Sequence, residues 1–416
     1  MTLAPKWESF KRYFAKIPYL QASRQFQRQF SFSSTYRKPL NIIFFGSDEY
    51  SIASLKRLEN LKSKEPGIIN RLDVATRKWK QAGSIKEVPI AEVARSLNLD
   101  LHVAETRHDF KDISSKRYDI AVAVSFGKLI PASFLKSMAY GGVNLHPSLL
   151  PRHSGPAPMQ WTIWERDPFT GVTLQTLDLE HFDKGHILMQ SELIKLEQNE
   201  SFDSLLVKLA PIGADLLAKA ITKISKSADL IAQSSGASIL NPAEFLLPLF
   251  ESTSKSAFEQ QFSHAPKVDN KKRQIRWDNS PLVDIERQAR AFGTPLWTNI
   301  VSRRKRDGEL LTRRVHIDGI RDVSTEIKEL LPNPPKVVGE YVKATEKLRA
   351  FFPGIFVRTF DGHVIHASMK SETYNKTERR DSRVFDNIFH LDRERAAQAA
   401  SRPPRHYPSR PRSTSL

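Results

Sequence analysis

The stretch Asn41-Ile42-Ile43-Phe44-Phe45-Gly46-Ser47-Asp48 predicts a short buried strand that ends in a tight turn. Apolar residues then recur at helical spacing, namely Ile52, Leu55, Leu58 and Leu61. A strand, a turn and a helix in this order are typical of the start of an α/β domain.

The same alternation continues along the chain. Ile120-Ala121-Val122-Ala123-Val124 is a continuous apolar run, as expected for a strand that is buried on both faces. Gly142–Leu145 and Val172–Leu177 predict two further strands, and helical patterns occupy Ile90–Leu97 and Leu205–Ile224. Strands that alternate with helices predict an α/β fold with a parallel-rich sheet, and we place this domain at residues 40–225.

Composition limits the function classes. The 416 residues contain 64 Lys and Arg against 46 Asp and Glu, a formal net charge of +18, which favours a polyanionic partner such as nucleic acid. There is no Cys, which excludes disulfides, thiolate metal sites and cysteine nucleophiles. No apolar run approaches the roughly 20 residues that a membrane-spanning helix needs, so we expect no membrane partner.

The N-terminal segment 1–39 is basic, nearly free of acidic residues and rich in Ser towards its end. Phe10, Phe14 and Ile17 recur at helical spacing within it. This composition is typical of a mitochondrial transit peptide, which predicts a mitochondrial matrix protein. The alternative is a disordered basic arm that contacts nucleic acid in a cytosolic protein.

The C-terminal half divides into three pieces. Residues 226–262 gain Ser, Lys and Gln and predict a linker with one short helix. Residues 263–370 carry short apolar runs between turn residues and a helix near Leu282–Ala291, which predicts a small all-β barrel module. Residues 371–416 are rich in Arg, Ser and Pro and predict a basic, mostly disordered tail.

Candidate catalytic residues concentrate after the Gly142–Leu145 strand. Asn144 and His146 are two apart, so in an extended chain both side chains point the same way. Asp183 lies in a Gly-containing loop that could return to them. Amide, imidazole and carboxylate together suit the addition of an amine to a carbonyl group. The alternatives are ordinary turn residues, or a Ser148/His146/Asp183 hydrolase, although Ser148 lacks the Gly-x-Ser-x-Gly elbow.

Several motifs resemble one enzyme family, the folate-dependent formyltransferases. They are Asn144-x-His146 followed by Ser148-Leu149-Leu150-Pro151, the first strand and turn, Val124–Pro131, and Gly171-Val172-Thr173 leading to Asp183. The C-terminal half is similar to that of the methionyl-tRNA formyltransferases in His264–Val268, Ile275–Asp278 and Arg290–Trp297. Together the resemblance covers roughly residues 40–370.

The resemblance implies a Rossmann-like catalytic domain followed by an OB-like tRNA-binding β-barrel. It implies 10-formyltetrahydrofolate as formyl donor, the α-amine of initiator methionyl-tRNA as acceptor, and a monomeric enzyme. No metal is expected, because His264, His316, His363 and His366 lack the Cys or carboxylate spacing typical of a metal site. Asn144 and His146 would stabilise the tetrahedral oxyanion, and Asp183 would orient His146. Ser148, Leu149, Leu150 and Pro151 would line the folate site.

Basic clusters agree with an RNA partner, because such clusters neutralise phosphates. The resemblance implies that a basic loop contacts the acceptor stem, and Arg77, Lys78, Lys80 and Lys86 are its candidates here. Candidates in the β module are Lys271, Lys272, Arg273, Arg303, Arg304, Lys305 and Arg306. Solvated surface charge is the alternative. For the whole chain, the alternatives are another formyl-folate transferase or hydrolase, or a catalytically idle RNA-binding relative.

Overall fold

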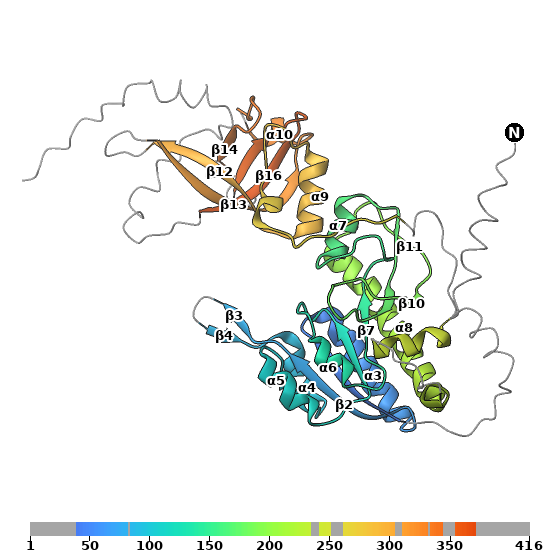
Figure 1. Cartoon of the computed structure of the whole chain (residues 1–416). Coiled ribbons are helices and arrows are strands. Elements are labelled where there is room, and N and C mark those ends of the chain that lie inside the picture. The colour runs from blue at the N-terminus through green and yellow to red at the C-terminus, as the bar shows by residue number, and fades with distance from the viewer. Residues whose placement is uncertain are drawn as a thin grey trace, which may run out of the picture. The chain divides into compact units, whose positions relative to one another are not determined.

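The computed structural model describes residues 39–81, 84–233, 241–250, 261–303, 310–331, 333–343 and 354–371 (Figure 1). The predicted targeting segment and basic tail lie outside these residues, apart from residues 39 and 371. The chain divides into two compact units. The first unit comprises Met1–Pro158, Phe169–Lys195 and Leu206–Ala265, and the second comprises Met159–Pro168, Leu196–Leu205 and Pro266–Leu416.

A seven-stranded, mostly parallel sheet forms the centre of the first unit. Its order is β10-β9-β7-β6-β1-β2-β5. The pairs from β5 to β7 are parallel, and β9 and β10 are antiparallel additions. This confirms the predicted α/β domain with a parallel-rich sheet. The strands are β1 (Leu40–Gly46), β2 (Ile69–Thr76), β5 (Leu101–Val103), β6 (Ile120–Val124), β7 (Gly142–His146), β9 (Thr173–Thr176) and β10 (Ile187–Gln190).

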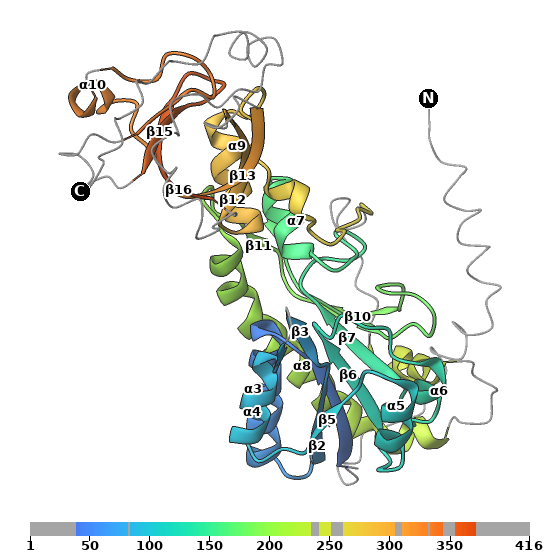
Figure 2. The ribbon, with the colours of Figure 1, turned by 90° about the vertical axis from the view of Figure 1, so that its left-hand side faces the viewer.

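Helices cover both faces of this sheet, with α3 and α4 on one side and α5 and α6 on the other (Figure 2). Asp48 begins α3 as part of a capping box with Ser51, which satisfies backbone N–H groups at the helix start. Gly213 allows the long helix α8 to pack on α3, because a Cβ there would lie 2.6 Å from the Tyr50 hydroxyl. The helices are α3 (Glu49–Lys64), α4 (Pro89–Ser96), α5 (Arg107–Ser114), α6 (Ala132–Lys136) and α8 (Phe202–Gln233).

The structure differs from the sequence prediction at the end of this domain. Helix α8 continues to Gln233, past the expected boundary at residue 225, and a 3-10 helix η1 covers Pro242–Leu249. Neither Gly nor Pro interrupts residues 226–233, so their polar composition does not stop the helix. Two small antiparallel pairs complete the unit, β3 (Trp79–Gln81) with β4 (Ser84–Lys86) and β8 (Phe169–Thr170) with β11 (Ile194–Lys195).

An antiparallel sheet of five strands forms the second unit, in the order β12-β13-β16-β15-β14. Trp277 is fully buried in its core and donates a hydrogen bond to Thr298 Oγ1 over 3.1 Å. The elements are α7 (Pro158–Trp164), η2 (Asn270–Arg273), α9 (Leu282–Phe292), β12 (Leu296–Arg303), β13 (Leu310–Asp322), α10 (Ile327–Leu330), β14 (Tyr341–Lys343), β15 (Ile355–Arg358) and β16 (Val364–Ser371). Among the described residues, no helix is long and apolar enough to cross a membrane.

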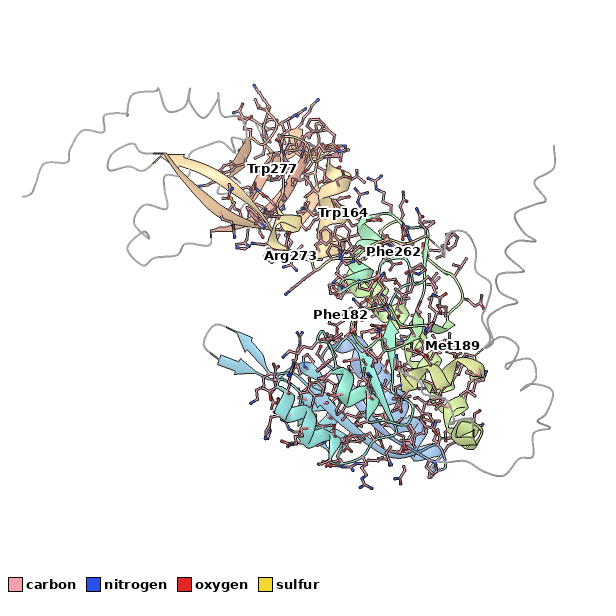
Figure 3. All side chains as sticks on the ribbon, in the orientation of Figure 1. Trp164, Phe182, Met189, Phe262, Arg273 and Trp277 are labelled. Atoms are coloured by element: carbon pink, nitrogen blue, oxygen red, sulfur yellow. The ribbon has the colours of Figure 1, made fainter. Side chains whose placement is uncertain are left out.

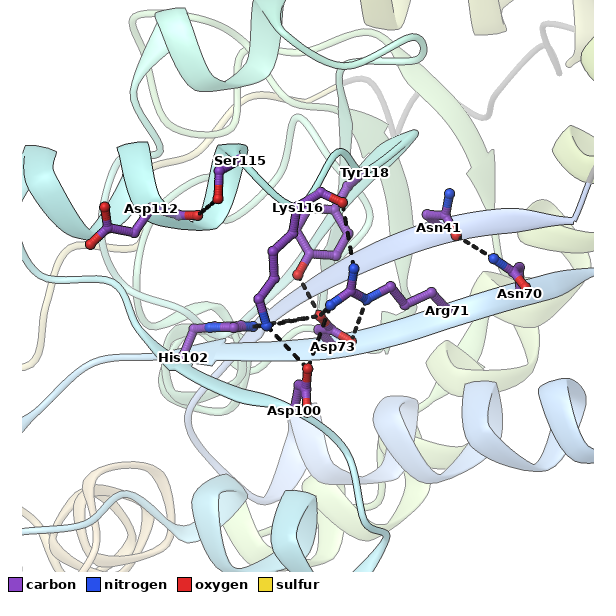
Figure 4. A network of polar contacts seen from close by, with 10 residues as sticks. All are labelled: Asn41, Asn70, Arg71, Asp73, Asp100, His102, Asp112, Ser115, Lys116 and Tyr118. Atoms are coloured by element: carbon purple, nitrogen blue, oxygen red, sulfur yellow. Dashed lines mark hydrogen bonds and ion pairs between the residues drawn. The ribbon is translucent and has the colours of Figure 1, made fainter.

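A buried carboxylate, Asp73 on β2, is the centre of a polar network in the first unit (Figure 4). Arg71 Nη2 lies 2.8 Å from it, and the Tyr118 hydroxyl donates to it over 2.5 Å. Burial alone would raise the pKa of Asp73. Hydrogen bonds from His102, Tyr118 and Arg71 outweigh that effect and lower the pKa to about 2.

The variant Tyr118→Phe is expected to lower the free energy of unfolding by about 2 kcal/mol at neutral pH, because it removes a hydrogen bond to a buried charge. A folded pKa below the unfolded one stabilises the fold above the unfolded value, and this stabilisation is lost as pH falls through the folded one. The wild type should therefore lose stability between about pH 4 and pH 2. Urea unfolding at several pH values measures both effects. Equal midpoints for wild type and variant would contradict the assignment.

Candidate active site

Asn144 and His146 lie at the carboxyl end of β7. Their Cα partners on β9 are Gln175 and Thr173. Directly opposed residues of an antiparallel pair present their side chains to the same face, so four polar side chains share one face at this edge of the sheet. Carboxyl ends of strands are where open α/β sheets bind ligands.

The loop between β9 and β10 brings Asp183 to these residues. Asp183 Oδ1 lies 3.4 Å from His146 Nδ1 and accepts a hydrogen bond from Asn144 Nδ2 over 3.2 Å. Asp183 Oδ2 accepts from the Gly155 backbone N–H over 2.8 Å. The structure therefore brings together the three residues that the sequence analysis singled out.

Backbone conformation makes this approach possible. Asp183 has a φ of 52° and His153 a φ of 56°, both in the left-handed region that non-glycine residues rarely adopt. Such conformations cluster at functional sites. Gly185 allows the loop to lie against β9, because a Cβ there would be 1.7 Å from the Thr176 carbonyl oxygen.

Hydrogen bonding fixes the orientation of His146. Its Nε2 lies 3.0 Å from the His153 carbonyl oxygen, which can only accept, so Nε2 carries a proton. Its Nδ1 faces Asp183, which holds the ring in place. The Asn144 amide has two N–H bonds and gives one to Asp183. The second N–H and the His146 Nε2–H are the donors suited to an oxyanion.

The Ser148–Pro151 segment, expected to line a folate site, is held by buried hydrogen bonds. Ser148 Oγ donates to the Arg152 carbonyl oxygen over 2.7 Å, and the Thr173 hydroxyl donates to the Ser148 carbonyl oxygen over 2.7 Å. Ser148, Leu149 and Leu150 are buried, whereas Pro151 is partly exposed. Because its hydroxyl is bonded to a backbone carbonyl, Ser148 is not placed as a nucleophile.

Sequence analysis missed the segment that supports the His153–Gly155 turn. Ser263 Oγ accepts a hydrogen bond from the His153 N–H over 2.9 Å, and the Ala265 N–H donates to the Ser154 carbonyl oxygen over 2.8 Å. The sequence pattern and the resemblance place residues 263–265 in the C-terminal module, whereas in the structure they belong to the first unit. A pattern could not have placed them here, because the contact spans more than a hundred residues.

The basic candidates of the first unit follow the end of strand β2. The Arg77 guanidinium packs against Gly127, since a Cβ there would lie 3.4 Å from Arg77 Nη1. The Lys78 N–H donates to Glu105 Oε1 over 2.7 Å, and Lys128 pairs with the same carboxylate. Arg77 and Lys78 lead into the β3–β4 hairpin that carries Lys80 and Lys86, whose side chains lie outside the described ones.

Among the basic candidates of the second unit, those of η2 are described by the structure and most of those after β12 are not. Lys271, Lys272 and Arg273 lie in η2, and Figure 3 shows Arg273 projecting from the surface. Lys272 Nζ lies 4.7 Å from the centre of the Trp161 ring, a cation–π contact. Arg303 ends β12, but its side chain and residues Arg304, Lys305 and Arg306 lie outside what the structure describes.

Within the first unit, the described residues include one group whose ligand atoms lie close enough together to hold a cation. The ligand atoms of Asp73, Asp100 and His102 lie within 4.8 Å of one another. Arg71 and Lys116 already pair with both carboxylates (Figure 4). A cation would have to displace them, so we assign no metal to this group.

Comparison with known proteins concerns the α/β domain first. Residues 40–221 match the family model of the formyl transferases. The α/β domain is therefore similar to this family over these residues, and the expected family resemblance is confirmed.

Several of the curated proteins that the chain is similar to are methionyl-tRNA formyltransferases. The chain is 36% identical over 178 residues to the putative methionyl-tRNA formyltransferase of Schizosaccharomyces pombe, covering 42% of this chain and 50% of that one. It is 38% identical over 177 residues to the mitochondrial enzyme of Saccharomyces cerevisiae, covering 37% and 44%. It is 29% identical over 265 residues to the mitochondrial enzyme of Bos taurus, covering 63% and 60%. The chain thus spans about half the length of these relatives.

Proposed function

We propose that this protein transfers the formyl group of 10-formyltetrahydrofolate to the α-amine of methionyl-tRNA, which gives formylmethionyl-tRNA for the initiation of translation. The observation that carries the proposal is the contact of Asp183 with both Asn144 and His146 in a formyl transferase domain. The similarity to methionyl-tRNA formyltransferases supports the choice of acceptor.

The chemistry follows from the donors in the site. The neutral amine attacks the formyl carbon, a C–N bond forms, and the carbonyl electron pair becomes an oxyanion. Asn144 Nδ2 and His146 Nε2 donate to that oxyanion, the latter by turning its N–H from the His153 carbonyl to the substrate. Collapse of the intermediate breaks the bond to the folate nitrogen. The proton that the amine loses passes, through His146 or water, to that nitrogen.

The remaining assignments rest on the family resemblance and, for the location, on the composition of residues 1–39. We propose that the Ser148–Pro151 segment contributes to the folate site. With the first three side chains buried, the backbone and Pro151 are the groups left for such contacts. We also propose that the second unit is an OB-like tRNA-binding barrel, that the enzyme is a monomer, and that residues 1–39 direct it to the mitochondrial matrix. The mitochondrial relatives support the location.

The first test is formyl transfer by the wild type from 10-formyltetrahydrofolate to methionyl-tRNA, with glycinamide ribonucleotide and water as competing acceptors. Formylation of the charged tRNA alone is expected. Transfer to glycinamide ribonucleotide, or release of formate without acceptor, would favour one of the other formyl-folate enzymes. Binding of tRNA without any transfer would favour an idle RNA-binding relative.

A second prediction concerns the cations of η2. The double variant Lys271→Ala/Arg273→Ala is expected to raise the KM for methionyl-tRNA while kcat changes little, because surface cations that meet phosphates supply affinity. Each lost phosphate contact should reduce the slope of log affinity against log salt by about 0.7–0.9. The matched control is Lys64→Ala/Arg107→Ala, which removes the same charge from helices α3 and α5. Equal salt slopes for the two double variants would contradict the assignment.

A further inference from the structure

Gln175 is a buried amide beside the three residues of the proposed reaction. It lies on β9 directly opposite Asn144 and is 1% exposed. Its Nε2 donates to Asp183 Oδ1 over 3.1 Å, the same oxygen that accepts from Asn144 and faces His146. Gln175 therefore contacts the carboxylate that faces the imidazole.

The carbonyl oxygen of the Gln175 amide differs from its N–H group. Gln175 Oε1 is fully buried and has no hydrogen-bond partner among the described residues. Turning the amide over would put this oxygen against the Asp183 carboxylate, so the orientation is set by Asp183. Buried polar atoms are nearly always paired in folded proteins, and an unpaired one is costly.

We propose that Gln175 is a positioning residue of the formyl transfer site: its amide N–H fixes the direction of the Asp183 carboxylate, and through it the orientation of His146. Three N–H groups donate to that carboxylate, from Asn144, Gln175 and Gly155, and His146 Nδ1 lies 3.4 Å from it. The Asn144 amide also serves the oxyanion with its second N–H. In the proposed reaction, the N–H groups of Gln175 and Gly155 serve Asp183 alone.

The inference rests on the proposed function and predicts that activity and stability separate. Gln175→Met keeps the length of the side chain and removes both the bond to Asp183 and the unpaired oxygen. Its melting temperature should therefore stay close to that of the wild type, while kcat falls up to about 100-fold, the cost of a misplaced catalytic group. The matched control is Tyr118→Phe, which removes a buried hydrogen bond elsewhere in the same unit. It should lower the melting temperature and leave kcat unchanged.

A second variant tests the contact with Asp183 itself. Gln175→Glu places a second carboxyl group beside Asp183, and two such groups cannot both ionise easily, so one of them holds its proton to higher pH. In the plot of kcat against pH, the acidic limb of Gln175→Glu should therefore lie at higher pH than that of the wild type. Gln175→Met adds no charge and should leave that limb in place. A role in packing alone would move neither profile.

Two outcomes would overturn the inference: a Gln175→Met variant with wild-type kcat, or a Gln175→Glu variant with an unshifted acidic limb. Failure of the proposed function would look different, since the wild type itself would then transfer no formyl group to methionyl-tRNA. In that case the ring-nitrogen NMR signals of His146 decide. They should change in Gln175→Met, because Asp183 moves relative to Nδ1, and unchanged signals would overturn the inference.

Discussion

The variant His146→Ala should transfer formyl groups about 1,000-fold more slowly than the wild type, within the range typical of lost acid–base groups. The imidazole supplies two things at once. Its Nε2–H is a donor for the oxyanion, and the ring is the path by which the amine proton can leave the site. The Asn144 amide cannot replace it, because an amide can donate a hydrogen bond but cannot take up a proton. Single-turnover transfer to methionyl-tRNA, at saturating donor, measures the effect on kcat.

Binding of tRNA at fixed salt is the necessary companion measurement, because phosphate contacts dominate affinity and lie elsewhere. His146→Ala should bind the charged tRNA as the wild type does. His108→Ala is the matched control, since His108 is an exposed residue of α5 that pairs with Asp112. A His146→Ala variant within about tenfold of the wild-type rate would show that the imidazole is not the proton-transferring group.

The strands and the pair of donors could be predicted because each follows from a local rule. Ile120–Val124 is apolar throughout because both faces of a central parallel strand are covered, and β6 has these bounds. Asn144 and His146 share a face because side chains alternate along a strand. These rules need no information from elsewhere in the chain.

The rest of the site depends on contacts that no local rule contains. Gln175 lies between Leu174 and Thr176 in an ordinary strand pattern and gives no catalytic signal, and its importance follows from the pairing of β9 with β7. Ser263 reaches His153 across a hydrogen bond between segments far apart in the sequence. Likewise, the Ser148 carbonyl oxygen is held by a hydrogen bond from the hydroxyl of Thr173, a residue of strand β9.

Gly185→Ala should reduce kcat about 100-fold or more without touching any reacting group. An added Cβ would lie 1.7 Å from the Thr176 carbonyl oxygen and 2.6 Å from its carbon. Both are backbone atoms at the end of β9, so neither can turn aside as a side chain could. The loop must therefore move away from β9 and carry Asp183 with it, while Asn144 and His146 stay on β7.

The same change should lower the free energy of unfolding by about 1–3 kcal/mol, the usual cost of overpacking. Gly362→Ala separates the two effects. Gly362 has a φ of 89° in a turn of the second unit, so an alanine there is strained, but it belongs to a different unit from Asp183. It should lose similar stability and keep its kcat. If both variants lost kcat equally, the cause would be general destabilisation. A selective loss in Gly185→Ala would establish that the closeness of the loop to β9 sets the position of the Asp183 carboxylate.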